Sequence, residues 1–177
     1  MVDIIKYPNE VLRKKVKEVL VVDKKTANQV KLLQNTLEKA DFAVGLAATQ
    51  LGIEKRFFGI KFAKKVRVFV NPKIIKCFGE MVFPAILDEN EKTEEFLEGC
   101  LSFPNLFGTV KRYLKIEVEW NGGKTILEGF EAIVFQHELD HLNGVLFIDH
   151  VKKDCGKLYK YVGDKKVEVL FRDLIQE

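Results

Sequence analysis

The sequence predicts a single domain that mixes helices with strands, and three features support this. The length of 177 residues suits one domain, expected to span residues 1–177, with a substantial core. Apolar residues and histidines recur at helical spacing across residues 130–141, which predicts a helix with one face in the interior. Residues 114–120 alternate between apolar and charged side chains. Asn-Gly-Gly at 121–123 then signals a hairpin turn into a return strand at 124–127.

The first third of the chain predicts two helices and one packed connector. Residues 9–18 predict a turn and a short helix, and residues 25–41 predict a longer helix with lysines outside. The apolar face of the longer helix consists of Val30, Leu33 and Leu37. Residues 43–50 are small and apolar, and small residues let a backbone approach its neighbours closely. A tightly packed connector is therefore expected there.

Four further segments predict strands, and one predicts a loop. β-branched and aromatic residues are frequent in residues 56–60, 66–70, 73–78 and 167–171. A turn signal, Asn-Pro, separates the second of these segments from the third. Residues 88–95 are acidic and polar, which favours a solvated loop over an acidic ligand site.

Composition argues against some classes of protein but does not identify a function. The net charge of +3 is too small to indicate nucleic-acid binding by itself. The three cysteines, Cys77, Cys100 and Cys155, do not form a disulfide framework, and an odd number fits a reducing compartment. The first twelve residues are charged and contain no long apolar run, so neither a secretory signal nor a membrane anchor is expected.

The predicted helix at 130–141 carries the clearest chemical pattern, H-E-x-x-H at residues 137–141. His137 and His141 are four positions apart and would project from the same face of a helix, where they can share one metal ion. Glu138 would lie beside them and could act as a general base on a metal-activated water. Two of the three histidines of the chain are used in this pattern.

A catalytic metal site commonly has three protein ligands, and the residues alone leave the third open. An extended protease pattern would place its third ligand at Phe147, which cannot coordinate a metal. A second protease class uses a downstream glutamate, for which Glu168 is a candidate. Cys100 is an accessible thiolate candidate because it follows glycine after a polar loop. Cys77 and Cys155 are expected to be plain thiols.

Three separate segments resemble the motifs of peptide deformylases. Residues 43–50, AVGLAATQ, are similar to a G-x-G-L-A-A-x-Q motif, and residues 98–102 read EGCLS. Residues 136–141 read QHELDH, and the resemblance covers roughly residues 4–150. The motifs are specific in this combination and order. The resemblance implies an α+β fold, with antiparallel β-sheets packed around a central helix that carries the H-E-x-x-H motif.

The resemblance also implies roles for individual residues. The implied metal ligands are Cys100, His137 and His141. Glu138 would be the general acid and base, and the Gln50 side chain and the Leu101 backbone N–H would donate to the developing oxyanion. The implied substrate-binding residues, around a methionine side-chain pocket and a peptide groove, are Val44, Gly45, Glu98, Ile133 and Val134.

The implied activity is removal of the N-formyl group from the N-terminal formylmethionine of nascent polypeptides, with release of formate. The family commonly uses one divalent metal ion, Fe(II), with zinc, nickel or cobalt as substitutes; the ligands alone do not select iron over zinc. The implied partners are N-formylmethionyl peptides and, transiently, the ribosome near its exit tunnel, with no membrane and no specific nucleic-acid motif. The implied location is the bacterial cytoplasm or an organelle of bacterial descent.

The sequence departs from the family pattern at several places. Ala43 replaces the first glycine of the first motif, residues 77–97 form a longer link than usual, and the basic C-terminal helix of some members is absent or reduced. Phe107 occupies a position where many bacterial members have arginine. Phe107 would either line the peptide groove or pack into the core, with another residue such as Arg112 bracing the groove.

Two alternative functions remain open at the level of sequence. The first is a metalloprotease that uses His137, His141 and Glu168. The second is a structural zinc site with cysteine and histidine ligands, which would normally be closed by four ligands. His150 is the only obvious candidate for a fourth ligand, and it is expected to be a surface residue.

Overall fold

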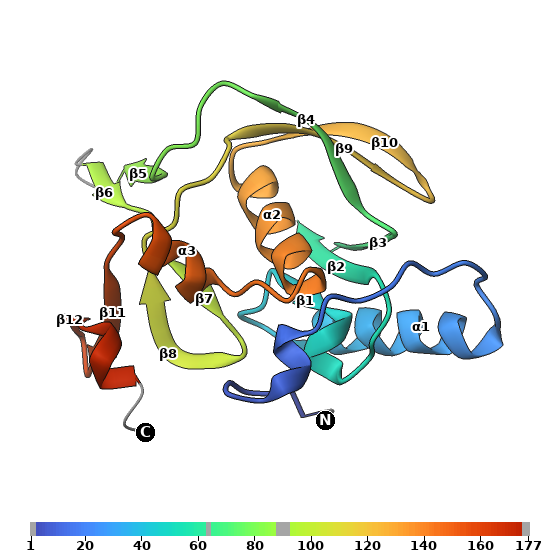
Figure 1. The fold of residues 1–177 in the computed structure, drawn as a ribbon, viewed down its shortest axis with the longest axis horizontal. Helices are drawn as coiled ribbons and strands as arrows, with labels where there is room; N and C mark the ends of the chain where they lie inside the picture. Colours follow the sequence, from blue (N-terminus) through green and yellow to red (C-terminus); the bar gives the residue numbers. More distant parts are fainter. Residues whose placement is uncertain (1–2, 63–64, 88–92, 175–177) are drawn as a thin grey trace.

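The structure, a computed structural model, describes residues 3–62, 65–87 and 93–174. It is an α+β fold in which small sheets surround one central helix, α2 (Phe130–Leu142), as Figure 1 shows. The strands of each sheet pair in antiparallel fashion throughout the described residues. The predicted fold class is therefore confirmed.

Helix α2 is buried around almost its whole circumference, as expected for a helix enclosed by a protein core. Phe135 is fully buried, and its ring contacts Phe58 and Phe69 edge-on at centroid distances of 5.0 and 5.2 Å. Phe130, at the start of the predicted apolar stripe, is instead 44% exposed. The helix therefore carries His137 and His141 inside the protein without a separate polar face.

The sheet β1-β2-β3 lies on one side of α2, and helix α1 covers its other face. The elements are α1 (Lys24–Lys39), β1 (Gly45–Ala47), β2 (Phe57–Phe62) and β3 (Lys65–Val70). Leu33 and Leu37 of α1 are fully buried, as their spacing predicts. The connector expected at 43–50 is instead β1 followed by the 3-10 turn η2 (Ala48–Leu51), because its backbone pairs with β2.

A second sheet, in the order β10-β9-β4, covers another side of α2. Its strands are β4 (Lys73–Phe78), β9 (Lys115–Trp120) and β10 (Gly123–Glu128). The predicted hairpin is confirmed, since β9 and β10 pair in register from Trp120 and Gly123 onward. Ile116 and Val118 are buried as the alternation predicts, whereas Leu114 precedes the strand and is exposed.

The third sheet has the order β12-β11-β8-β7. Its strands are β7 (Glu98–Cys100), β8 (Phe103–Gly108), β11 (Leu158–Val162) and β12 (Lys165–Val169), and β5 (Ala85–Leu87) pairs separately with β6 (Thr93–Glu95). Strands β5, β7, β8 and β11 were not predicted from the sequence. The predicted loop at 88–95 is wrong for residues 93–95, which form β6, and its residues 88–92 lie outside the described residues. The tail strand ends at Val169, before the 3-10 turn η3 (Phe171–Leu174).

The chain crosses itself closely at Gly144, between α2 and α3 (Phe147–Lys153). The predicted short helix near the N-terminus is the 3-10 turn η1 (Glu10–Arg13), and its last residue lies against Gly144. Gly144 has a φ of +73°, and a Cβ at this position would overlap the carbonyl group of Arg13. Gly144 is therefore required both for its backbone conformation and for the lack of a side chain.

Gly144→Ala is expected to lower the free energy of unfolding by more than about 3 kcal/mol, because left-handed strain of about 1–2 kcal/mol adds to a backbone overlap. Gly163→Ala is the matched control, since Gly163 has a φ of +59° but nothing within 4 Å of its Cβ position. The control should lose only the about 1–2 kcal/mol of unfolding free energy that the left-handed conformation costs a residue with a side chain. Urea unfolding of both variants checks this, and equal losses would contradict a close crossing at Gly144.

Candidate active site

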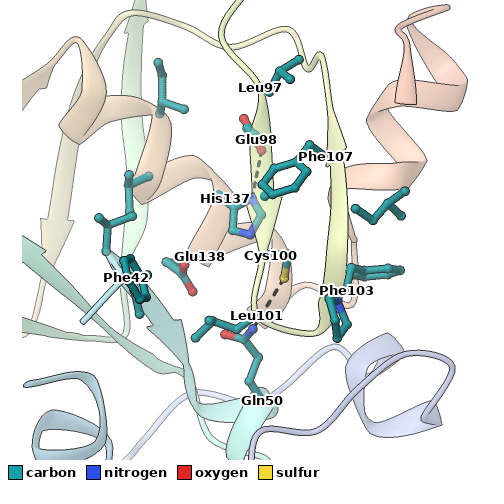
Figure 2. A pocket seen from close by; sticks show the side chains of 18 of the residues that line it. Phe42, Gln50, Leu97, Glu98, Cys100, Leu101, Phe103, Phe107, His137 and Glu138 are labelled. Carbon is teal, nitrogen blue, oxygen red and sulfur yellow. Dashed lines mark hydrogen bonds and ion pairs between the residues drawn. The ribbon is translucent and has the colours of Figure 1, made fainter. Parts of the chain in front are cut away.

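A pocket of about 610 Å³ opens between α2, β1, β7 and β8. All the residues with predicted site roles line it except His141. These lining residues are Val44, Gly45, Gln50, Glu98, Cys100, Leu101, Ile133, Val134, His137 and Glu138. His141 lies just beneath the pocket, 1% exposed, with its Nε2 3.3 Å from the Cys100 Sγ. Residues more than forty positions apart in the sequence thus converge on one cavity (Figure 2).

Among the described residues, the side chains of Cys100, His137 and His141 form a group that could hold a metal ion. Their three ligand atoms lie within 4.8 Å of one another. Metal–ligand bonds to thiolate and imidazole are about 2.0–2.3 Å long, so atoms this close can reach one ion. The Glu138 Oε2, which lines the same pocket, is buried without a protein partner. The donor set and its surroundings therefore fit a single divalent metal ion.

The Cys100 side chain has the charge state that a metal ligand needs. Burial is the largest influence on its pKa and raises it. The electrostatic influence of His141 and hydrogen bonds from His137 and His141 act in the opposite direction and lower the pKa of Cys100 well below its usual value. The sulfur is therefore held as a thiolate, which is the form that binds metal.

The other candidate ligands from the sequence lie elsewhere. Glu168 is exposed on β12 and is not part of the group. His150, which was expected at the surface, is only partly exposed: its side chain is 18% exposed, and its Nε2 lies 2.9 Å from the Asp140 Oδ2. The exposed thiols of Cys77 and Cys155 are free.

Glu98 faces His137, although the sequence analysis placed it at a substrate groove. Its Oε2 is 2.9 Å from the His137 Nδ1, so the Nε2 on the other side of that ring is directed to Cys100, where it can share a metal ion. Arg112 donates two hydrogen bonds to the same carboxylate, from its Nε at 2.7 Å and from its Nη2 at 3.0 Å. Burial raises the pKa of Glu98, but Arg112 and His137 outweigh it and bring the value to about 2. Glu98 is therefore ionised, and it orients His137.

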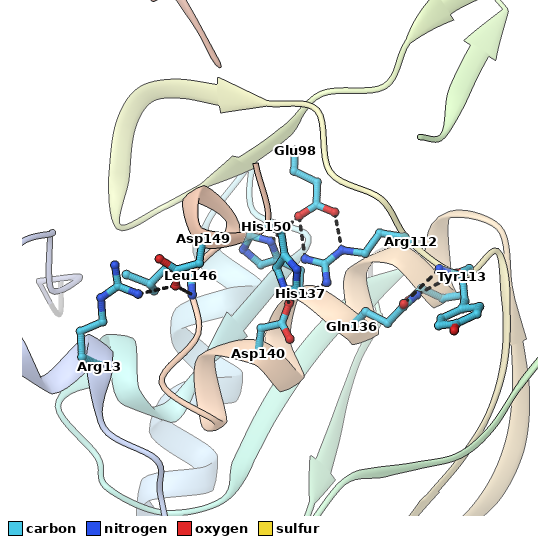
Figure 3. Close-up of polar contacts among 11 residues, drawn as sticks. Arg13, Glu98, Arg112, Tyr113, Gln136, His137, Asp140, Leu146, Asp149 and His150 are labelled. Atoms are coloured by element: carbon cyan, nitrogen blue, oxygen red, sulfur yellow. Dashed lines mark hydrogen bonds and ion pairs between the residues drawn. The ribbon is translucent and has the colours of Figure 1, made fainter. Parts of the chain in front are cut away.

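Arg112 is 2% exposed and continues this network outward, as Figure 3 shows. Its Nη1 donates to the Asp140 Oδ2 at 2.6 Å, and the same oxygen lies beside His150. Gln136 fixes Tyr113, the residue that follows Arg112, because its side chain accepts the Tyr113 N–H at 3.1 Å and donates to the Tyr113 carbonyl at 2.8 Å. The sequence offered Arg112 only as a possible brace for the groove, and no pattern placed it beside Glu98.

Glu138 is 4% exposed and lies at the wall formed by β1. Its carboxylate packs against the backbone of Gly45, where an added Cβ would overlap the Oε1 atom. Burial is the largest influence on its pKa and raises it to about 7, against the lowering effect of His137 and His141. A carboxyl group with such a pKa can both accept and return a proton near neutral pH.

Gln50 reaches the metal-ligating group from η2. Its Nε2 donates to the Ser102 Oγ at 3.1 Å and lies 3.6 Å from the Cys100 Sγ. Its Oε1 accepts the Ala47 N–H at 2.9 Å, which fixes the amide with its NH₂ toward the pocket. Ser102 was missed as a partner of Gln50, although it belongs to the EGCLS segment.

Aromatic side chains form much of the remaining pocket lining. Phe107 is half-buried and lines the pocket, so of the two alternatives for this residue the structure favours the groove. Its ring packs edge-on against Tyr161 at 5.4 Å and lies over Gly99, 2.9 Å from the Cβ position there. Phe42, which is 99% exposed, lies on the opposite side of Glu138 and His137 in Figure 2.

Comparison with known proteins identifies close counterparts. The family model described as "Polypeptide deformylase" matches residues 1–157. A peptide deformylase of Aquifex aeolicus is 38% identical over 161 residues, which cover 85% of this chain and 87% of the relative. A protein of Clostridium acetobutylicum named peptide deformylase 2 is 40% identical over 148 residues, covering 81% of this chain and 90% of the relative.

Solved structures agree with these relatives. The crystal structure of peptide deformylase from Thermotoga maritima superposes with a TM-score of 0.71 at 36% identity and covers 85% of this chain and 97% of that protein. A peptide deformylase from Legionella pneumophila superposes with a TM-score of 0.70 at 33% identity, covering 83% of each chain.

Proposed function

This chain belongs to the peptide deformylase family, and we propose on that basis that it hydrolyses the N-formyl group of N-formylmethionyl peptides. Water adds to the formyl carbon, the carbon–nitrogen bond breaks, and the products are formate and a peptide with a free N-terminus. The observation that carries the proposal is the convergence of Cys100, His137, His141 and Glu138 on one pocket. The family match spans that whole region. The metalloprotease alternative is not favoured, because Glu168 is exposed on β12.

We propose that Cys100, His137 and His141 hold one divalent metal ion. The bound ion supplies Lewis-acid activation of the attacking water and the formyl carbonyl. Fe(II) is the proposed native metal, with zinc, nickel or cobalt as substitutes, and the thiolate of Cys100 supports a soft or borderline ion. The network of Glu98, Arg112 and Asp140 would keep the His137 ring oriented toward the metal ion.

The remaining chemistry falls to residues around the formyl group. Glu138 would take a proton from the attacking water and pass one to the departing amine, a role that its pKa of about 7 supports. The Gln50 amide and the Leu101 backbone N–H would donate to the oxygen on which negative charge develops. Because Gln50 is held by Ala47 and Ser102, its donor needs little reorganisation during the reaction.

The proposed methionine pocket and peptide groove include Val44, Gly45, Ile133 and Val134, which line the cavity. Apolar side chains at this wall suit the unbranched thioether of methionine. Glu98 also lines the cavity, but its carboxylate is engaged by His137 and Arg112, so we assign it to ligand orientation instead.

We further propose that residues 1–177 form one catalytic domain that meets its substrates at the ribosome, near the exit tunnel. A bacterial cytoplasm, or an organelle of bacterial descent, is the proposed location, since nascent formylmethionyl chains arise there. The relatives named above are bacterial. Among the described residues, the helices are too short or too polar to cross a membrane.

The direct test of metal-dependent deformylation is formate release from formyl-Met-Ala-Ser by protein loaded with Fe(II) or Ni(II). Acetyl-Met-Ala-Ser is the matched substrate control. Formate is expected from the formylated peptide and no free N-terminus from the acetylated one, and a chelator should abolish formate release. A metal-loaded protein that released no formate would refute the proposal.

Gly45→Ala is expected to lower kcat by about 100-fold, because an added methyl group must displace the Glu138 carboxylate and small displacements of catalytic groups cost about this much. The metal content should not change. The same substitution made in Glu138→Gln should cost little further activity, since the displaced base is already absent. Full additivity of the two changes in kcat would contradict the contact.

A further inference from the structure

The N-terminal residues 5–7 bond to both chain segments that carry the proposed oxyanion donors. The Ile5 N–H donates to the Gln50 carbonyl oxygen at 2.9 Å, and the Tyr7 N–H donates to the Ser102 carbonyl oxygen at 3.0 Å. Between them, the Lys6 Nζ donates to the Leu101 carbonyl oxygen. Three consecutive residues thus tie the turn after β1 to the turn after β7, although about fifty positions separate those turns.

This N-terminal brace, defined as residues 5–7, is itself firmly anchored. The Tyr7 ring stacks on Phe103 with a centroid distance of 4.9 Å and an angle of 22° between the rings. The two turns that it joins also bond to each other, from the Gln50 Nε2 to the Ser102 Oγ at 3.1 Å. Because the brace is held at both ends, the Lys6 backbone has little freedom, and its side chain is directed to Leu101.

Lys6 is also unusual among the residues that line the pocket. In the described part of the chain it is the only lysine or arginine in that lining, where the other side chains are apolar, neutral or acidic. Figure 2 shows Leu101 and Gln50 beneath Cys100, at the end of the pocket where the formyl oxygen would receive its hydrogen bonds. A fixed positive charge here favours negative charge on that oxygen.

We propose that Lys6 is a positioning residue of the oxyanion site. By donating to the Leu101 carbonyl, Lys6 fixes the two peptide groups that flank Leu101 and adds positive charge beside them. This inference rests on the proposed function and deepens it. Leu101 presents its N–H and its carbonyl on adjacent peptide groups, so a hydrogen bond to the carbonyl limits the rotation of both. The benefit grows as charge develops on the formyl oxygen, so Lys6 acts on kcat rather than on substrate affinity.

The kinetic test compares Lys6→Met, Lys6→Arg and the wild type in formate release from formyl-Met-Ala-Ser. Lys31→Met is the matched control, because Lys31 is exposed on α1 and does not line the pocket. Lys6→Met should lower kcat by about 10-fold with KM within twofold, and Lys6→Arg should restore kcat to within threefold of wild type. A rise in KM alone, or equal losses in Lys6→Met and Lys6→Arg, would overturn the proposal.

A second measurement does not depend on activity. In zinc-loaded protein labelled with ¹⁵N, Lys6→Met should speed hydrogen exchange at the Leu101 amide and move its resonance, whereas Lys6→Arg and Lys31→Met should not. If the exchange rate and the resonance of the Leu101 amide did not change in Lys6→Met, the proposed positioning role of Lys6 would be overturned. If the wild type released no formate, the deformylase assignment would fail, and the Leu101 amide would still decide whether Lys6 fixes this peptide group.

Discussion

Glu138→Gln is expected to lower the rate of formate release by at least about 10²–10⁴-fold while metal binding is retained. The amide has nearly the same shape as the carboxylate, so the contact with Gly45 is kept. It cannot accept the proton of the attacking water or return one to the amine, however, and both proton transfers are lost. Glu138 lines the same pocket as Cys100 and His137 but is not one of the proposed ligands, so the loss of activity should not be accompanied by a loss of metal.

Single-turnover formate release and metal analysis of the same sample check this. Glu131→Gln, in the first turn of α2 and outside the pocket lining, is the matched control and should behave as wild type. Near-normal formate release from Glu138→Gln would remove Glu138 from the proton transfers. Loss of the metal from this variant would instead make Glu138 a ligand.

Cys100→Ser is expected to weaken metal binding by more than about 100-fold and to lower activity in parallel. Loss of a hydrogen-bond partner of a metal ligand already costs about 10–100-fold in metal affinity, and here the ligand itself is replaced. The neighbouring histidines hold the Cys100 sulfur as a thiolate, whereas a serine hydroxyl stays protonated and is a harder donor. Competition with a chromogenic chelator measures the affinity.

Cys77→Ser and Cys155→Ser are the matched controls for this substitution, because both cysteines are exposed and free. Neither should change metal affinity or formate release. Full metal occupancy and wild-type turnover in Cys100→Ser would transfer the third ligand position to another residue. That outcome would revive the metalloprotease alternative, in which His137 and His141 act with Glu168.

The parts of the fold that could be predicted from the sequence are those with a strong local period. Alternation in 114–120 and the turn after it predicted β9 and β10, and helical spacing predicted α2. Strands β7 and β8 were missed because Gly99, Pro104 and Asn105 break any strand pattern, and Asn105 has a φ of +54°. These strands are fixed by pairing with β11 and by packing around the pocket, which a local window does not contain.

The site residues that could be predicted from the sequence are likewise those that lie within one secondary-structure element. Helix geometry alone predicted that His137 and His141 share a face, since both lie in one element. The residues themselves left the third ligand open, and only the resemblance of the EGCLS segment singled out Cys100. Arg112 and Lys6 reach the site through tertiary contacts, so no spacing in the sequence could connect them to it.

The most direct test of deformylation is a complete product analysis after incubation of the Ni(II)-loaded protein with formyl-Met-Leu-Phe and with a longer formylated peptide. Formate and free N-termini should appear in equal amounts, while every bond between amino-acid residues stays intact by mass spectrometry. Cleavage within the peptide, without formate, would contradict the account and favour a protease.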